Sequence, residues 1–191
     1  VDTSAVVIHE NEYCASFFCT TDDVQNQIAS FYPGAMVHSA EATLAQHAPD
    51  ADLVIVSPSD PAAMMAIPDE CRSLGINFRF DPSQQTIRFN GEQLMSGIRG
   101  SRLLTSNEYE RSLILDKTGL SEDDILAETG GWLLTLGENG SSLIVDGTEH
   151  HIPAVKPKQV VEPTGAGDAY RAGLMRGMQL GLSWEVAGRM G

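Results

Sequence analysis

The feature that most constrains the fold is an alternation of helical and extended segments through most of the chain. Four short apolar runs have the length and composition of strands buried on both faces, at residues 53–56, 76–80, 102–105 and 132–135. Segments with helical spacing separate them, at residues 39–47, 61–74 and 107–119. Because parallel strands need crossover connections, this order predicts an α/β fold with a Rossmann-like, mostly parallel sheet flanked by helices.

Two residues mark helix ends in this pattern. Ser39 is a candidate N-cap for the helix at 39–47, because a serine hydroxyl can accept a hydrogen bond from a free backbone N–H. Gly75 follows the helix at 61–74 and is a candidate C-terminal cap, because glycine adopts the left-handed conformation without a steric penalty.

Residues 1–36 differ from the rest of the chain and are rich in β-forming residues. Short β-branched and aromatic runs lie at 6–8, 13–19 and 27–32, and Asp22-Asp23 indicates a turn between the last two. One interpretation is a meander at the edge of a sheet. We therefore divide the chain into a β-rich segment at 1–36 and an α/β core at 37–191.

A small-residue turn leads directly into a helical run at 170–180. The turn and its next residue are Thr164, Gly165, Ala166, Gly167 and Asp168. The first N–H groups of a helix have no intrahelical partner, and glycine permits close approach, so the turn is a candidate site for a phosphoryl group. Asp168 would lie beside that anion, where it could accept a proton from an attacking hydroxyl. The alternative is that Asp168 is an ordinary helix N-cap.

Two further patterns follow the ends of predicted strands. Asn107 and Glu110 lie three residues apart on one helix face, at the sheet edge where α/β folds bind ligands. They also fit a capping box, which would give them a structural role only. Thr135, Gly137 and Gly140 form a glycine turn whose amides could meet a phosphate. The same turn fits a hairpin into the run at 142–145, and both roles can hold together.

Residues 164–169 read Thr-Gly-Ala-Gly-Asp-Ala and resemble the second signature of the ribokinase-like (PfkB) family of sugar and nucleoside kinases. That signature is roughly Asp-Thr-x-Gly-Ala-Gly-Asp-Ala-Phe, and Glu162, Pro163 and Tyr170 depart from it. The Asn-x-x-Glu and Thr-x-Gly-x-x-Gly patterns resemble two other motifs of the family and occur in the family's order. Residues 27–36 look like a stretch typical of the bacterial adenosine-kinase-like branch.

The resemblance implies an ATP-dependent kinase that phosphorylates a hydroxymethyl group of a nucleoside, with adenosine favoured, or of a sugar. It implies that Asp168 is the catalytic base and that the amides of Gly165, Ala166 and Gly167 form an anion hole. Nucleotide binding then falls to Thr135, Gly137, Gly140 and Thr164. The Mg²⁺ ion that acts with ATP is assigned to Asn107 and Glu110.

The resemblance also implies a ribokinase-like fold in which a small β-sheet lid covers the acceptor, and part of residues 1–36 would belong to that lid. The resemblance covers only the middle and later parts of the family's chains. We therefore expect the core at 37–191 to be incomplete, the acceptor site to lie largely elsewhere, and this chain alone to be inactive. The rival interpretation is a non-catalytic relic or a nucleotide-sensing subunit of the same fold.

Many members of the family bind K⁺ beside the anion hole, near the first two residues of the signature. Glu162 and Pro163 occupy those positions here. The glutamate is one methylene longer than aspartate, and proline lacks an N–H and restricts the residue before it. We therefore expect no strong activation by K⁺, while a site built on backbone carbonyls stays open.

Composition excludes several other classes of function. The chain has 191 residues, with 12 Lys and Arg against 26 Asp and Glu, a net charge of −14 that disfavours nucleic acid and anionic membranes as partners. ATP stays open, because Mg²⁺ and backbone amides can hold phosphate. Three cysteines without a CxxC pattern indicate reduced thiols and a cytoplasmic protein. Tyr170 stands where a dehydrogenase fingerprint needs its third glycine. A homodimer stays open.

Overall fold

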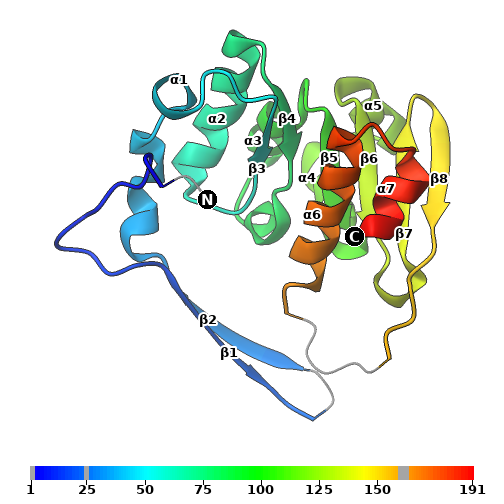
Figure 1. Ribbon diagram of the computed structural model, residues 1–191, viewed down its shortest axis with the longest axis horizontal. Helices are drawn as coiled ribbons and strands as arrows, with labels where there is room; N and C mark the ends of the chain where they lie inside the picture. Colours follow the sequence, from blue (N-terminus) through cyan, green and yellow to red (C-terminus); the bar gives the residue numbers. More distant parts are fainter. Residues whose placement is uncertain (1–2, 24–25, 159–163) are drawn as a thin grey trace.

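The computed structural model describes residues 3–23, 26–158 and 164–191, which form a six-stranded sheet with helices on both faces and a separate hairpin (Figure 1). The strand order is β3-β4-β5-β6-β7-β8. The pairs from β3 to β6 are parallel, and β7 and β8 are added antiparallel. The predicted α/β class, a mostly parallel sheet flanked by helices, is confirmed.

The strands of the sheet follow the predicted apolar runs closely. Their bounds are β3 (Leu53–Val56), β4 (Asn77–Phe80), β5 (Leu103–Asn107), β6 (Gly131–Thr135), β7 (Ser141–Val145) and β8 (Thr148–Ile152). β8 is the last strand of the order, at the edge of the sheet, and contains His150 and His151.

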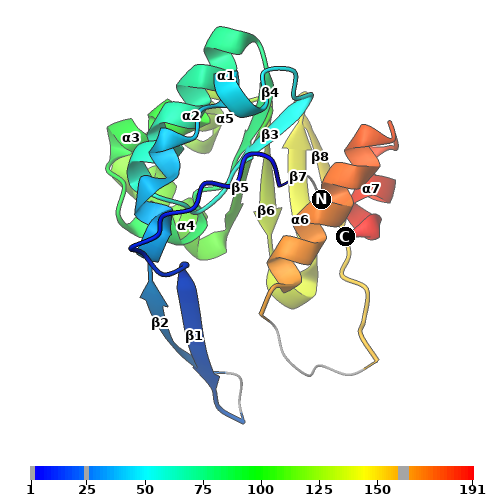
Figure 2. The same ribbon diagram turned by 60° about the vertical axis from the view of Figure 1, so that its left-hand side comes forward.

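Helices cover the sheet on two sides, as crossover connections require (Figure 2). One face carries α2 (Pro61–Leu74), α3 (Gly91–Ile98), α4 (Glu108–Thr118) and α5 (Glu122–Glu128). The other face carries α6 (Ala166–Gln179) and α7 (Trp184–Met190). Neither α3 nor α5 was predicted, although each begins with a capping box, at Asn90 and Ser121 respectively.

The cap at Gly75 is confirmed, but the helix at 39–47 is not. Gly75 has φ +70° and ends α2. Residues 39–47 are divided between a 3-10 helix, η1 (Gly34–Glu41), and a short helix, α1 (Leu44–His47), whose N-cap is Thr43. The Ser39 hydroxyl donates to the Met36 carbonyl at 2.7 Å inside η1, so it caps nothing. A local side-chain bond of this kind competes with helix capping.

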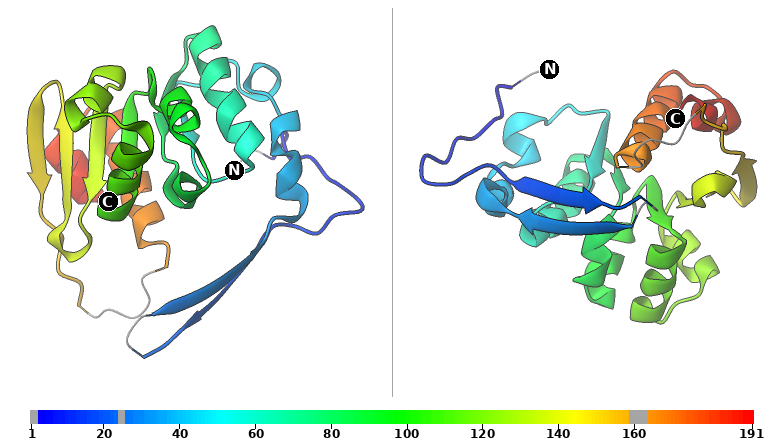
Figure 3. Two further views of the ribbon diagram at one scale, coloured as in Figure 1. Left: turned by 180° about the vertical axis from the view of Figure 1, so that it is seen from behind. Right: turned by 90° about the horizontal axis from the view of Figure 1, so that it is seen from below.

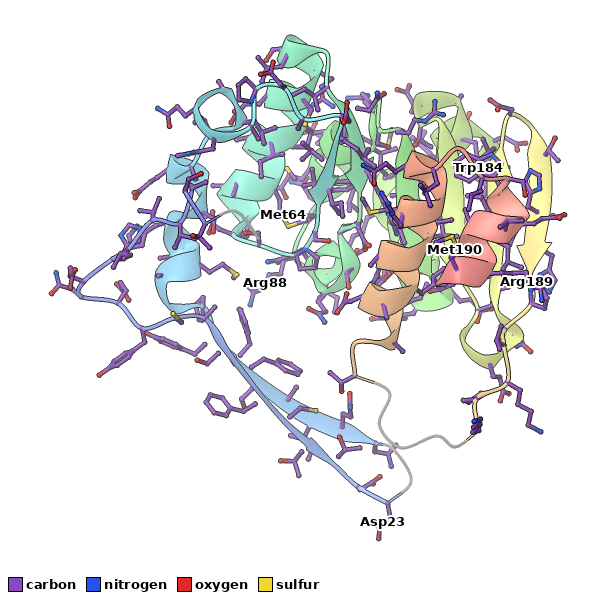
Figure 4. All side chains as sticks on the ribbon, viewed as in Figure 1. Asp23, Met64, Arg88, Trp184, Arg189 and Met190 are labelled. Atoms are coloured by element: carbon purple, nitrogen blue, oxygen red, sulfur yellow. The ribbon has the colours of Figure 1, made fainter. Side chains whose placement is uncertain are left out.

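Two apolar clusters fill the space on either side of the sheet. The larger lies under α2, α3, α4 and α5 and includes Phe78, Phe80 and Trp132. The smaller lies under α6 and α7 and includes Leu133, Leu143 and Leu174. Trp184, at the start of α7, packs against the smaller cluster (Figure 4).

Two glycines of α6 allow close packing against α7 and the residue that follows it. A Cβ added at Gly177 would lie 2.5 Å from the Cα and Cβ atoms of Ala187. A Cβ added at Gly173 would lie 2.5 Å from the Cα atom of Gly191. The glycine face of α6 therefore allows α7 to pack very close to it.

The N-terminal hairpin consists of β1 (Ser16–Thr21) and β2 (Gln27–Tyr32), which pair antiparallel as a sheet of their own. A meander at the edge of the main sheet is therefore wrong. The hairpin passes below the carboxyl ends of the parallel strands (Figure 3), and Asp23 lies at its far end (Figure 4). Residues 6–8, one of the predicted β-forming runs, are exposed and form no strand.

Two 3-10 turns complete the described elements, η2 (Ser83–Ile87) and η3 (Gly137–Asn139). Among the described residues, no helix is both long and apolar enough to cross a membrane. Cys14, Cys19 and Cys71 are free thiols, as the sequence indicates.

Candidate active site

The three predicted motifs meet at one edge of the sheet, the edge formed by the carboxyl ends of the parallel strands. Asn107 and Thr135 are direct partners in the register between β5 and β6, at the carboxyl ends of both strands. The first turn of α6, which contains the third motif, lies at the same edge (Figure 1). This is the edge at which open α/β sheets bind their ligands.

A cavity of about 590 Å³ at this edge joins the two glycine turns. Its wall includes Thr135, Gly137 and Gly140 from the loop after β6 and Ala166 and Gly167 from α6. Thr164, Gly165 and Asp168 do not line it. A larger hollow of about 1040 Å³ between β3 and α6 contains none of the predicted site residues, so size alone does not locate the site.

The glycine turn forms the start of α6. Gly165 is the N-cap, with φ +81°, and has no side chain that could bond to the N–H groups of the first turn. Those N–H groups and the helix dipole are available to an anion. Asp168 lies in the first turn of the helix, so its interpretation as the N-cap is wrong.

The loop after β6 is a tight hairpin turn built on two glycines. The Leu136 N–H donates to the Gly140 carbonyl at 2.8 Å, and β7 follows at once. Gly137 and Gly140 have φ values of +57° and +87°, which other residues rarely adopt. A Cβ at Gly140 would also lie 2.1 Å from the Ile152 carbonyl oxygen. The hairpin role is confirmed, and nucleotide binding by this turn stays a prediction.

Asp168 offers an accessible carboxylate beside the turn. Its side chain is 86% exposed, and its Oδ1 accepts a hydrogen bond from Arg171 Nη1 at 3.2 Å. The guanidinium contacts one side of the carboxylate and leaves most of it open to solvent.

Arg171 lies against the sheet and is largely buried. Its side chain is only 19% exposed, with Nε 2.5 Å from Asp81 Oδ2. Asp81 follows β4 and is 1% exposed. Arg79, also buried, contacts the same oxygen, with Nη2 3.6 Å from Asp81 Oδ2, and its Nε donates to Thr105 Oγ1 at 2.8 Å. Through Arg171, the buried carboxylate of Asp81 is thus connected to Asp168, the candidate base.

Burial dominates the electrostatics of this cluster. It raises the pKa of Asp81 to about 6, although the neighbouring Arg171 and Arg79 act to lower it. Burial also lowers the pKa of Arg79 to about 10, although Asp81 acts to raise it. Sequence reasoning missed Arg79 and Asp81. A signal was available, because Arg79 and Asp81 alternate with Phe78 and Phe80 along a buried strand. Charges buried in this way need partners, which marks both residues for attention.

Asn107 and Glu110 form a capping box at the start of α4. The Asn107 N–H donates to Glu110 Oε2 at 2.9 Å, and the Glu110 N–H donates to Asn107 Oδ1 at 2.8 Å. The structural role is therefore confirmed. Glu110 is largely buried near the Asp81 carboxylate, and the box uses only one of its two carboxylate oxygens. Oxygen ligands of this kind fit Mg²⁺, so the residues present are compatible with that ion.

Tyr170, which replaces the phenylalanine of the signature, links α6 to β7. Its hydroxyl lies 2.5 Å from Ser141 Oγ, at the wall of the cavity. Burial raises the pKa of Tyr170, so the phenol is neutral at physiological pH. Glu162 and Pro163, on which the prediction about K⁺ depends, lie outside the described residues.

Comparison with known proteins identifies the family. The profile of the pfkB family of carbohydrate kinases matches residues 1–191. The nucleoside kinase of Methanothermobacter thermautotrophicus is 31% identical over 191 residues, which are 99% of this chain and 61% of that protein.

Solved structures give the same result. Nucleoside kinase from Burkholderia thailandensis in complex with inosine has a TM-score of 0.89 and 38% identity, over 94% of this chain and 59% of that one. The same kinase in complex with ADP-inosine has a TM-score of 0.87 over 56% of its chain. Nucleoside kinase from Methanocaldococcus jannaschii, an archaeal member of the ribokinase family, has a TM-score of 0.83 and 27% identity, over 95% of this chain and 60% of that one.

Fold and site together define an α/β protein of the ribokinase-like class. The chain belongs to the pfkB family of carbohydrate kinases. It spans about 60% of the length of the relatives that it matches.

Proposed function

We propose that the full-length protein transfers the γ-phosphoryl group of ATP to a hydroxymethyl group of a nucleoside. The observation that supports this best is the meeting of two glycine turns at one cavity, with the exposed carboxylate of Asp168 beside it. The matched relatives are named nucleoside kinases, and one was solved with inosine and with ADP-inosine.

In this proposal the 590 Å³ cavity receives the nucleotide. The residues assigned to it are Thr135, Gly137, Gly140 and Thr164. The amides of Gly165, Ala166 and Gly167 face the transferring phosphoryl group and stabilise the charge that develops there. Fixed amides serve this purpose well, because they need no reorganisation during the reaction.

Asp168 acts as the base that takes the proton of the acceptor hydroxyl. Its exposure gives an acceptor direct access, and the contact with Arg171 limits the positions of its carboxylate. Arg171 is in turn held by the buried Asp81. Arg171 and Asp81 are therefore positioning residues in this scheme, and of these three side chains only Asp168 meets the acceptor.

Mg²⁺ would be held by Glu110 and Asn107, directly or through water, and would neutralise phosphate charge when bound. The capping box orients the Glu110 carboxylate toward this edge of the sheet. The same residues can thus fix the start of α4 and meet the ion.

Adenosine is our first choice of acceptor, because residues 27–36 resemble the adenosine-kinase-like branch. Inosine is the next to test, because it is bound to the structural relative. We expect the 191-residue chain alone to be inactive, since the matched relatives are longer, and we expect the enzyme to work in the cytoplasm.

The deciding experiment is a coupled assay of ADP formation with the full-length protein and adenosine, inosine, cytidine or ribose. Asp168→Asn should lower turnover at least about a hundredfold, the low end for a positioned base, and leave ATP affinity nearly unchanged. The control is Asp123→Asn on α5, an exposed carboxylate in the first turn of another helix.

Near wild-type turnover in Asp168→Asn would rule out its role as the base. A wild-type protein that binds ADP in calorimetry but phosphorylates none of the four acceptors would instead support the non-catalytic relic or sensor.

A further inference from the structure

A cluster of metal-binding side chains lies far from the kinase site in sequence. One ligand atom from each of His9, His38 and Glu41 lies within 4.8 Å of the other two. We propose that these three residues bind one divalent transition-metal ion of the Zn²⁺ type. The proposal is independent of the kinase function.

Two of the ligands come from η1. His38 and Glu41 are three residues apart, and side chains at this spacing lie above one another in a 3-10 helix. His38 Nδ1 is 3.0 Å from Glu41 Oε1. The helix geometry thus brings an imidazole and a carboxylate together on one side of η1 without help from the rest of the fold.

The third ligand comes from the N-terminal segment, which is held against η1. The Ala35 N–H donates to the Tyr13 carbonyl at 2.9 Å, and the Glu12 N–H donates to the His9 carbonyl at 3.0 Å. Gly34 has φ +46°, and a Cβ there would lie 2.1 Å from the Tyr13 carbonyl oxygen. Only glycine permits this close approach, so the contact of the N-terminal segment with the start of η1 depends on Gly34, and the turn from His9 to Glu12 leads into it.

The rings of His9 and His38 are stacked, with centroids 4.1 Å apart and planes inclined by 17°. A tetrahedral ion with metal–ligand bonds of about 2.1 Å holds its ligand atoms roughly 3.4 Å apart. Rotation of the side chains would therefore have to draw the ligand atoms together. Glu41 is 61% exposed and His38 33% exposed, so both have room for this movement.

The chemistry of the cluster selects the kind of ion. Imidazole nitrogen and carboxylate oxygen are ligands of Zn²⁺ and its neighbours, and a water would complete a tetrahedral site. Mg²⁺ prefers an octahedron of oxygen atoms, so two imidazoles disfavour it. A bound ion would join the N-terminal segment, which precedes β1, to η1, which follows β2. It would thus lie at the base of the hairpin.

The test is a titration of tag-free full-length protein with Co²⁺, followed by visible absorption, and with Zn²⁺, followed by calorimetry, both in excess Mg²⁺. We expect one equivalent of Co²⁺ to give the strong absorption of a tetrahedral site. His9→Gln and His38→Gln should each weaken Zn²⁺ binding at least about tenfold, as the loss of a ligand requires. The matched controls are His47→Gln on α1 and His151→Gln on β8, which should bind as wild type does.

Equal Zn²⁺ affinity in the wild type and in both cluster variants would overturn the proposal, as would a loss of binding in the His151→Gln control. Circular dichroism checks the folding of each variant. Should a histidine variant misfold, Glu41→Gln replaces it, because that exposed side chain can change without loss of packing.

Discussion

At the scale of single residues, the buried Asp81 carboxylate connects the sheet to the helix that bears the candidate base. It contacts both Arg79 of β4 and Arg171 of α6. Arg171 also reaches Asp168, so the buried contact of Arg171 with Asp81 holds the arginine that contacts the exposed Asp168 carboxylate. The contact with Asp81 explains why the Arg171 side chain is largely buried.

Removing both oxygens of this carboxyl should be destabilising. Asp81→Ala leaves the buried N–H groups of Arg79 and Arg171 without these acceptors, which should lower the free energy of unfolding by about 1–3 kcal/mol. Asp69→Ala is the matched control, because it removes an exposed partner of Arg72 and should change stability by less than about 1 kcal/mol. Urea unfolding measures both, and equal effects would contradict the role of Asp81.

The raised pKa of Asp81 also predicts a pH dependence. The native carboxyl has a pKa of about 6 against an ordinary value of 3.8, so the native state binds more protons between these values. The contribution of Asp81 to the free energy of unfolding should therefore fall as pH rises from about 4 to about 6, and stay constant above. The measurement is the difference in unfolding free energy between wild type and Asp81→Asn at each pH. A difference that rises over this interval would refute the assignment.

Glu110→Gln separates the two roles of that residue. The amide oxygen can still accept the Asn107 N–H, but it loses the charge that attracts a cation. If Glu110 holds Mg²⁺, the variant should need more Mg²⁺ for half-maximal activity. If it is only a cap, stability should fall by about 1 kcal/mol and the Mg²⁺ requirement should not change. Kinetics and urea unfolding of one variant decide between them.

At the scale of elements, the pairing of α6 with α7 determines where the glycine turn lies. The two helices meet at Gly177 and Ala187, and they cover the cluster around Leu133 and Leu143. Because the first turn of α6 forms one wall of the cavity, a shift of this helix pair would move the anion site itself.

Gly177→Ala tests this contact. Alanine normally stabilises a helix interior relative to glycine by up to about 1 kcal/mol. Here the added Cβ would lie 2.5 Å from two atoms of Ala187, so overpacking should reverse the sign and lower the free energy of unfolding by about 1–3 kcal/mol. Ala172→Ser, on an exposed part of the same helix, should change it by no more than about 0.5 kcal/mol. Thermal unfolding is the readout, and a stabilised Gly177→Ala would show that the helices are farther apart.

At the scale of the whole molecule, net charge complicates any test of cation dependence. A net charge of −14 attracts every cation, and added salt of any kind screens the repulsion among the acidic groups. A specific effect of K⁺ must therefore be separated from ionic strength.

We expect no strong activation by K⁺, because Glu162 and Pro163 replace the Asp and Thr of the signature. The longer side chain and the missing N–H disfavour the same loop conformation. The full-length enzyme should be assayed in buffer without Na⁺ or K⁺, and then titrated with KCl against a non-activating salt at equal ionic strength. A several-fold rise that only K⁺ produces would contradict this expectation.

The sequence by itself determined what depends on neighbouring residues. The apolar run of β3, the bounds of α2 with its Gly75 cap, and the capping box of Asn107 and Glu110 are all encoded within a few positions. The order of the three motifs likewise indicated the family before the fold was known. Periodicity and caps are local properties, so they can be predicted without knowledge of the fold.

Only the tertiary structure decided which distant residues meet. Arg171 and Asp81 are 90 positions apart, and their contact depends on the strand order and on the placement of α6 over the sheet. The contact of Gly177 with Ala187, the separate sheet of the hairpin and the approach of His9 to His38 are of the same kind. No local pattern specifies such contacts, because they form only when elements that fold independently are packed together, and packing depends on the whole chain.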